Sequence, residues 1–307
     1  MASLSIWQAG AFRLDLRVPR IMGIVNVTPD SFSDGGHHAD TVSALRHAER
    51  LVHEGAAILD IGGESTRPGA EPVPLELELE RVLPVVRHAV ELKVPISVDT
   101  YKPEVMQAAL DLGASIINDI WALRWRTGPD GLDGEQVVAR HGSCGVCLMH
   151  MHRDPLTMQM QPMQGSAAEV VQEVGRFLQQ RTHVLQSLGV ARERIALDPG
   201  IGFGKTVPQN FSLLAYQPLL EITGQPLLAG WSRKSSLGAV LEALPPGITD
   251  VDYRSDLLSH ERSLASVTAA VLAVDRGARV VRVHDVAATR QALAVWQAMH
   301  AVAAPLS

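Results

Sequence analysis

Residues 194–206 read RIALDPGIGFGKT, and this stretch combines the features that decide the fold. The short apolar run that ends at Asp198 is typical of a buried strand, and a glycine-rich segment follows it directly. The ending Gly-Lys-Thr resembles a phosphate-binding loop. That motif needs a glycine five positions before Gly204, where this chain has Pro199. We therefore interpret the stretch as one strand and the loop that leads into the next helix.

The same pattern of a short apolar run followed by a longer segment recurs along the chain. Segments such as 41–55 and 264–278 have the spacing of amphipathic helices. The apolar runs predict strands at 21–27, 56–62, 95–99, 114–119, 145–150, 194–198, 226–230 and 280–285.

Eight strands that alternate with helices predict an α/β fold, a closed parallel (β/α)₈ TIM barrel. A doubly wound open sheet is the alternative. It is disfavoured because no G-x-G-x-x-G follows the first strand, and because polar residues end nearly all eight runs. The chain contains no linker long enough to divide it, so we expect residues 1–307 to form a single domain.

Composition excludes several classes of protein. With 307 residues, 46% of them hydrophobic, the chain can bury a full core. The net charge of −6 argues against a general nucleic-acid surface. The start of the chain has no secretory signal pattern, and no run of apolar residues is long enough to span a membrane. We expect a cytoplasmic protein with no membrane partner.

Two cysteines, Cys144 and Cys147, have the C-x-x-C spacing of redox pairs and half zinc sites. They lie in a predicted strand, where residues three apart point to opposite faces. We expect both to be structural.

In a barrel of this kind the strand ends and the loops after them form the active site. Asp60 and Asp119 are equally well explained as caps or turn residues. The argument for a site is convergence, because the barrel would bring five chemically useful residues into one cavity: Asp99, Asn118, Asp198, Lys234 and Arg282.

These residue types suit a flat heterocycle. A carboxylate such as that of Asp198 accepts two parallel N–H donors, which an amino-pyrimidinone edge offers. Lys234 can donate to a ring carbonyl, and the planar cation of Arg282 can stack on a ring face.

A second group suits an anion. Arg67, Arg282 and His284 are cationic or donate to anions, and Asn26 offers an oxygen to Mg²⁺, which commonly bridges substrate phosphates. The segment SRKSSLG at 232–238 predicts a helix start whose backbone N–H groups, with the Ser235 hydroxyl, bind a carboxylate.

Together these stretches resemble the dihydropteroate synthases, folate-pathway enzymes of bacteria. The matching motifs occur in family order across residues 21–286: IVNVTPDSFSDGG, DIGGESTRPGA, ISVDTYKPEV, IINDI, CLMHM, LDPGIGFGKT, SRKSSLG and VVRVHDV. The resemblance implies a transferase that condenses 6-hydroxymethyl-7,8-dihydropterin diphosphate with 4-aminobenzoate, releasing diphosphate with the help of Mg²⁺. It also implies a homodimer and a target of sulfonamides.

The resemblance further implies a role for each matching residue. The pterin would be held by Asp99, Asn118, Asp198 and Lys234, with Met149 in the pocket wall. The diphosphate would bind Mg²⁺, Asn26, Arg67, Arg282 and His284. The aminobenzoate would lie between Thr66, Pro68, Phe203 and Lys234, with its carboxylate facing Ser235, and Gly202 would let the backbone approach the substrate closely.

The family's reaction is similar to a dissociative substitution, in which diphosphate leaves before the amine attacks. The pterin cation needs nearby negative charge, which Asp99 and Asp34 can supply, and the loops TPDSFSD and STRPGA would close over it and exclude water. Lys205 and Thr206 are then expected at the lip of the loop and at the cap of the next helix.

Two rivals remain. A methyltetrahydrofolate–corrinoid methyltransferase would share the fold and the pterin recognition, but would need neither the cationic group nor the SRKS loop. A catalytically silent pterin-binding paralogue is disfavoured only by the intact loop motifs. The chain departs from the family pattern in two tryptophans between 121 and 134 and in a long segment around 245–260.

Overall fold

The computed structural model describes residues 5–27, 36–67, 69–126, 128, 131–243 and 254–302. Within them, eight parallel strands close into a barrel in the order β10-β3-β4-β5-β6-β7-β8-β9. The barrel strands are β3 (Arg20–Asn26), β4 (Ile58–Gly62), β5 (Ile96–Asp99), β6 (Ile116–Asp119), β7 (Gly145–Met149), β8 (Ile195–Asp198), β9 (Leu227–Ala229) and β10 (Ala278–Val283). Each overlaps its predicted apolar run, so the prediction of a (β/α)₈ barrel is confirmed.

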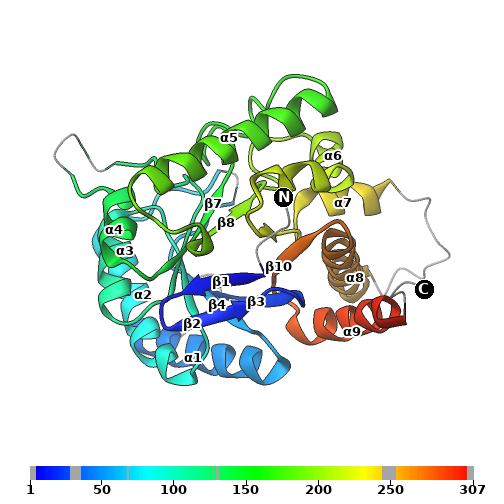
Figure 1. Ribbon diagram of the computed structural model, residues 1–307. Helices are drawn as coiled ribbons and strands as arrows, with labels where there is room; N and C mark the ends of the chain where they lie inside the picture. The colour runs from blue at the N-terminus through cyan, green and yellow to red at the C-terminus, as the bar shows by residue number, and fades with distance from the viewer. Residues whose placement is uncertain are drawn as a thin grey trace.

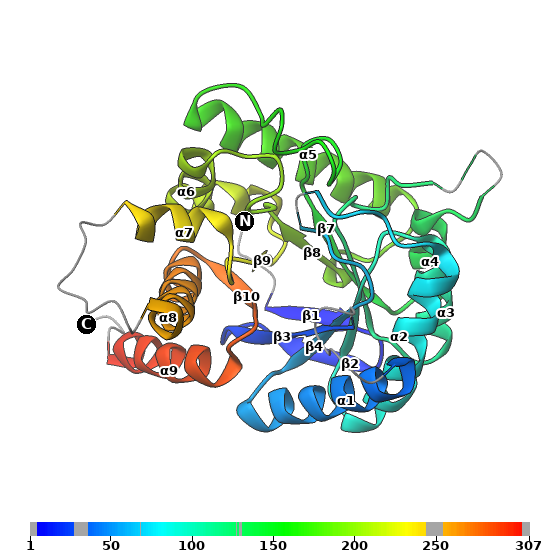
Figure 2. The same cartoon turned by 180° about the vertical axis from the view of Figure 1, so that it is seen from behind.

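Helices form a ring outside the strands (Figures 1 and 2). They are α1 (Gly36–Glu54), α2 (Leu75–Ala89), α3 (Pro103–Asp111), α4 (Gly134–His141), α5 (Ala167–Ser187), α6 (Val207–Ala215), α7 (Ser235–Glu242), α8 (Arg254–Asp275) and α9 (Val286–Val302). Short 3₁₀ turns occur at η2 (Val90–Leu92), η3 (Arg192–Arg194) and η4 (Gln217–Thr223). The main core lies between this ring and the outer faces of the strands.

A second core fills the barrel's interior. Its strand residues form one layer near the strand starts: Met22, Ile58, Ile116, Cys147, Ala196, Leu228 and Val280. Two positions further along most of these strands, the inward side chain is polar, as at Asp60, Asn118, Asp198 and Arg282. Because side chains alternate between faces, a slip of one residue would turn these polar groups into the helix layer.

An N-terminal hairpin closes the bottom of the barrel. Strands β1 (Ile6–Ala9) and β2 (Phe12–Asp15) pair antiparallel, with Gly10 at φ +60 in the turn. The Trp7 side chain is fully buried against the interior core, and its indole Nε1 donates to the Arg194 carbonyl at 3.0 Å. The hairpin was not predicted, although its two-residue turn around a glycine is a recognisable signal.

The two cysteines lie as expected. Cys144 packs in the core outside the barrel and Cys147 in the core inside it, and both are buried free thiols. In the described part of the chain, no helix is long and apolar enough to cross a membrane.

Candidate active site

The inner polar residues form the floor of a cavity at the carboxyl ends of the strands. The cavity holds about 480 Å³ of space, including the part open to solvent. Its lining comes from most of the barrel strands and the segments after them: Ile24, Thr66, Asp99, Asn118, Ile120, Met149, Asp198, Ile201, Phe203, Gly230, Ser232, Lys234 and Arg282.

Arg282 is held rigidly on one side of this floor. Its Nε donates to Asp60 Oδ2 at 2.6 Å, and its Nη2 donates to Asp99 Oδ2 at 2.7 Å. The Asn118 amide donates to the same Asp60 oxygen at 3.2 Å. Charge-assisted bonds from two carboxylates fix the plane of the guanidinium, because its donors form a rigid fork.

Asp60 was missed as a member of the site. The sequence left a cap or turn role open for Asp60 and Asp119. Asp60 is fully buried within β4 and pairs with Arg282, whereas Asp119 accepts the backbone N–H groups of Trp121 and Leu123 in a turn. The signal was available, because Asp60 lies two residues after the inward Ile58 and opposite Ile24 in register.

Burial dominates the electrostatics here. It raises the pKa of Asp99 to about 7, although the charge of Arg282 opposes the shift. Burial alone would lower the pKa of Arg282, but the charges of Asp60 and Asp99 outweigh it and raise the pKa overall. Arg282 therefore keeps its positive charge inside the cavity wall.

Asp198 and Lys234 lie on another side of the cavity. Asp198 Oδ1 accepts the backbone N–H of Gly200 at 2.6 Å, while burial raises the carboxyl pKa and Lys234 opposes that rise. The Lys234 ammonium sits 4.2 Å from the centre of the Phe203 ring, a cation–π contact. Burial lowers the Lys234 pKa to about 8.

The glycines after Asp198 were expected to let the backbone approach the substrate. Two of them instead let the loop pack against the backbone of His150 and His152. Gly200 and Gly204 have φ of +69 and +68. A Cβ at Gly200 would lie 1.9 Å from the His150 carbonyl oxygen, and one at Gly204 would lie 2.7 Å from that of His152. The glycines thus let this loop pack on the segment after β7. Gly202 lies behind Lys234, where a Cβ would meet Lys234 Cδ at 3.1 Å.

Lys205 was wrongly placed at the lip of the loop. It is 2% exposed, and its ammonium donates to three backbone carbonyls, those of Gly200 at 2.8 Å, Phe203 at 3.1 Å and His150 at 3.3 Å. Thr206 does cap α6, in a reciprocal capping box with Gln209.

His284 lies just after β10 and is half-buried. Its Nδ1 is 2.9 Å from the Ser232 hydroxyl, which also accepts the His284 backbone N–H at 3.3 Å. Burial, followed by the charges of Arg233 and Arg282, lowers the His284 pKa to about 3. With this lowered pKa, His284 can meet an anion only as a neutral hydrogen-bond donor.

The remaining predicted residues lie around the rim or outside the description. Asn26 ends β3 beside Gly62, Arg67 is exposed in the loop after β4, and Ser235 is the exposed first residue of α7. Asp34 and Pro68 lie outside the described residues, as does the 245–252 segment. Besides Asp60, the sequence analysis missed the apolar lining by Ile24, Ile120 and Ile201, together with the lining residues Gly230 and Ser232.

The described residues offer few ligands for a magnesium ion. Among the described residues, no three His, Cys, Asp or Glu side chains group as a metal cage. Mg²⁺ often keeps several waters and binds mainly through substrate phosphates. The half-buried Asn26 at the rim fits that kind of site as a single amide oxygen ligand.

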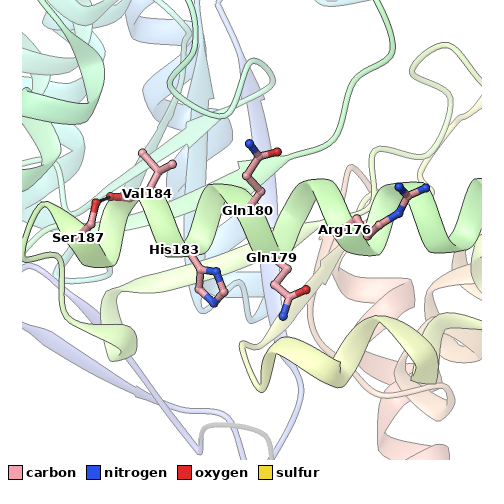
Figure 3. Close-up of a pocket in the computed structure, with 6 residues that line it drawn as sticks. All are labelled: Arg176, Gln179, Gln180, His183, Val184 and Ser187. Atoms are coloured by element: carbon pink, nitrogen blue, oxygen red, sulfur yellow. Dashed lines mark hydrogen bonds between the residues drawn. The ribbon is translucent and has the colours of Figure 1, made fainter.

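A second hollow lies along helix α5 and shares no lining residue with this cavity (Figure 3). Its lining residues all project from the one helix α5: Arg176, Gln179, Gln180, His183, Val184 and Ser187. No second element faces them across the hollow among its lining residues, so we assign it no function.

Comparison with known proteins assigns the chain to one class, barrel enzymes that bind pterins. The family model of pterin binding enzymes matches residues 22–284, and the chain belongs to that family. It is 47% identical to the dihydropteroate synthase of Neisseria meningitidis serogroup C, covering 96% of this chain and 97% of that protein. The resemblance to dihydropteroate synthases, and with it the prediction of a transferase, is confirmed.

Two solved structures agree over nearly the whole chain. The Xanthomonas albilineans dihydropteroate synthase with 4-aminobenzoic acid is 46% identical with a TM-score of 0.83, covering 98% of this chain and 99% of that one. The Burkholderia cenocepacia dihydropteroate synthase complexed with 7,8-dihydropteroate is also 46% identical, with a TM-score of 0.81 and 99% of each chain covered.

Proposed function

We propose that this protein condenses 6-hydroxymethyl-7,8-dihydropterin diphosphate with 4-aminobenzoate to give 7,8-dihydropteroate and diphosphate. The observation that carries the proposal is the polar floor of the cavity, where Asp99, Asn118, Asp198, Lys234 and Arg282 converge. The relatives of known structure that hold 4-aminobenzoic acid and 7,8-dihydropteroate support the choice of substrates.

The pterin is assigned to the floor. The Asp198 carboxylate accepts two N–H donors of the amino-pyrimidinone edge, Lys234 donates to the ring carbonyl, and Asn118 contributes its amide. Arg282, held in plane by its two carboxylates, offers its face to the ring. Met149 forms part of the apolar wall beside it.

The aminobenzoate is assigned to the space above, between Thr66, Phe203 and Lys234, with Pro68 as a further predicted contact. Its carboxylate faces the start of α7, where Ser235 is exposed and where the backbone N–H groups of the first helical turn favour an anion. The amine then points towards the pterin carbon that carries the diphosphate.

The diphosphate is assigned to the rim near Asn26, Arg67, Arg282 and His284. Mg²⁺ would be held there by Asn26 and the phosphate oxygens, and would supply neutralising charge for the leaving group. Arg282 remains charged, and His284 donates as a neutral imidazole.

We infer a dissociative order of bond changes. The carbon–oxygen bond breaks first, and diphosphate departs with the electron pair. The amine nitrogen then forms the carbon–nitrogen bond and loses a proton. Asp99 faces the developing cation from the floor, and Asp34 is a further predicted source of negative charge. Closure of the loops over the site would keep water from capturing the cation.

A direct assay tests the function. Purified protein is incubated with dihydropterin diphosphate, 4-aminobenzoate and Mg²⁺, and 7,8-dihydropteroate is measured. Formation of this product supports the proposal, whereas tight pterin binding without turnover identifies a silent paralogue.

Isotope exchange tests the order of bond changes. The substrate carries ¹⁸O in the bridge between carbon and phosphorus and is incubated with enzyme and Mg²⁺ without aminobenzoate. Reversible departure of diphosphate moves the label into non-bridging positions of recovered substrate. If product forms readily but the label never moves, the cation does not form ahead of the amine.

The resemblance also implies that the protein is cytoplasmic, forms a homodimer and binds sulfonamides in place of aminobenzoate. Exposed apolar side chains on α8 and α9, including Leu264, Leu272 and Val295, are compatible with a partner subunit there. The mass in solution, measured by light scattering, tests the dimer. Competition of a sulfonamide with aminobenzoate tests the inhibitor site.

A further inference from the structure

A buried cluster of charges lies behind the cavity at the base of the loop after β4. The Lys102 ammonium makes ion pairs with both Glu64 and Glu78, and the three side chains are 7%, 8% and 1% exposed. The Tyr101 hydroxyl donates to the second Glu64 oxygen at 2.9 Å. Buried charges are costly unless they are paired and hydrogen-bonded, so the pairing of Lys102 with two buried carboxylates indicates a constraint on structure.

The Glu64 carboxylate also joins the two ends of its own loop. Its Oε2 accepts the backbone N–H of Val73 at 3.2 Å, nine residues along the chain. This contact closes the neck of a loop over residues 64–73, which contains Thr66 in the cavity wall and the exposed Arg67. One carboxylate therefore receives Tyr101, Lys102 and Val73 together.

The residues that Glu64 contacts are themselves closely packed. Tyr101 packs edge-on against Trp125 with ring centres 5.1 Å apart, and the Lys102 ammonium lies 4.6 Å from the centre of the Tyr101 ring. At the start of the loop, a Cβ at Gly63 would lie 2.7 Å from Val82 Cγ2, so the backbone is pressed against α2. Trp125, one of the two unexpected tryptophans, thus supports the residue to which Glu64 is bonded.

We propose that Glu64 is a positioning residue, whose carboxylate closes the neck of the 64–73 loop and anchors it on Tyr101 and Lys102. Thr66 then lines the cavity from a fixed base, with the exposed Arg67 next to it. This inference rests on the proposed function, because the loop is assigned to the aminobenzoate and the diphosphate.

The test uses the full-length protein with Glu64→Gln and Glu64→Ala. Loss of hydrogen bonds to a charged group corresponds to roughly a tenfold to hundredfold effect. We expect the KM for aminobenzoate to rise by about tenfold in Glu64→Ala. We expect the calorimetric affinity for 6-hydroxymethyl-7,8-dihydropterin, which lacks the diphosphate, to be unchanged because Asp198 and Asn118 lie on the barrel floor.

Hydrogen exchange reports on the loop independently of activity. We expect the amides of residues 65–73 to exchange about tenfold faster in Glu64→Ala, with those of β8 unchanged. This readout separates the two proposals. If the wild-type protein makes no dihydropteroate, the proposed function fails, while the exchange of the loop still tests the role of Glu64.

Tyr101→Phe is the milder variant, because it removes one hydrogen bond to Glu64 and keeps the packing on Trp125. It should change the KM and the exchange rates in the same direction by a smaller factor. Tyr216→Phe, at a tyrosine 53% exposed on the surface, is the matched control and should change neither. Unchanged loop exchange in a folded Glu64→Ala protein, or an equal loss of pterin and aminobenzoate binding, would overturn the inference.

Discussion

At the residue scale, the largest departure from expectation is Lys205. The sequence Gly-Lys-Thr after a glycine-rich segment predicts either phosphate binding or an exposed loop, and neither describes this side chain. Its ammonium donates hydrogen bonds to three buried backbone carbonyls. One of them belongs to His150, 55 residues earlier. Local sequence cannot indicate a partner at that separation, because only the packing of two loops creates it.

We expect Lys205→Met to destabilise the protein by about 3 kcal/mol, because buried carbonyls would lose their donor. Met has a similar length and is apolar, so the change isolates the hydrogen bonds from the packing. Urea unfolding measures the effect. Lys93→Met, at an exposed lysine, is the control. A Lys205→Met protein as stable as the wild type would show that the ammonium contributes nothing to the loop.

His284 makes stability depend on pH in a predictable direction. Its pKa is about 3 in the folded protein against an ordinary value of 6.5, so the unfolded chain binds the proton first as pH falls. The contribution of His284 to the free energy of unfolding is fully present above about pH 6.5 and is lost as the pH falls towards the folded pKa. At about pH 5 the loss amounts to about 2 kcal/mol.

Unfolding by urea at about pH 7 and about pH 5 checks this, with His284→Gln as the variant that cannot titrate. The wild type should lose more stability than His284→Gln over this range. His183→Gln, at an exposed position on α5, should behave like the wild type. Equal losses in wild type and His284→Gln would mean that burial does not hold His284 neutral.

At the element scale, periodicity predicted most of the architecture. All eight barrel strands were located by apolar runs, because strands buried on both sides are nearly continuous in apolar residues. The hairpin β1–β2 was missed because polar residues interrupt both strands, IWQA and FRLD, so neither forms a continuous apolar run. The hairpin contributes to stability because it covers the open bottom of the barrel.

We expect Trp7→Ala to cost about 3–5 kcal/mol of stability, in the range of large-to-small substitutions in cores. Trp7 is fully buried at the end of the barrel opposite the cavity, so the binding of a pterin to the folded variant should be unchanged. Chemical denaturation and calorimetry provide the two measurements. Val18→Ala, at a valine 42% exposed, is the control. A loss below about 1 kcal/mol would show that the hairpin is not part of the core.

At the scale of the whole molecule, the apolar residues that stabilise the barrel and the polar residues of the cavity lie in separate layers along its axis. Apolar residues such as Met22 and Val280 fill the lower layer, and Asp60 and Arg282 occupy the layer above. Strand-end chemistry predicted that Asp99, Asn118 and Asp198 share a cavity, because parallel strands end at one face. It could not predict the pairing of Arg282 with Asp60, 222 residues away, or the neutral state of His284, since both depend on packing.

This arrangement predicts that metal removal acts on one part of the site only. In the proposed function, Asp198 and Asn118 bind the pterin through hydrogen bonds, which need no metal. In the same proposal, departure of diphosphate depends on positive charge from Arg67, Arg282 and the metal, because a low pKa keeps His284 neutral. With excess chelator, product formation should fall by about 100-fold or more, as several kcal/mol of charge stabilisation is lost.

Binding of 6-hydroxymethyl-7,8-dihydropterin should persist in the same chelator, and added Mg²⁺ should restore turnover. Asn26→Ala should raise the Mg²⁺ concentration that gives half-maximal rate, because the proposed amide ligand is gone. Thr268→Ala, on the outer helix α8, is a control that should leave this concentration unchanged. Full turnover in chelator would mean that side chains alone stabilise the leaving diphosphate. Loss of pterin binding in chelator would mean that the metal is also needed to bind the pterin.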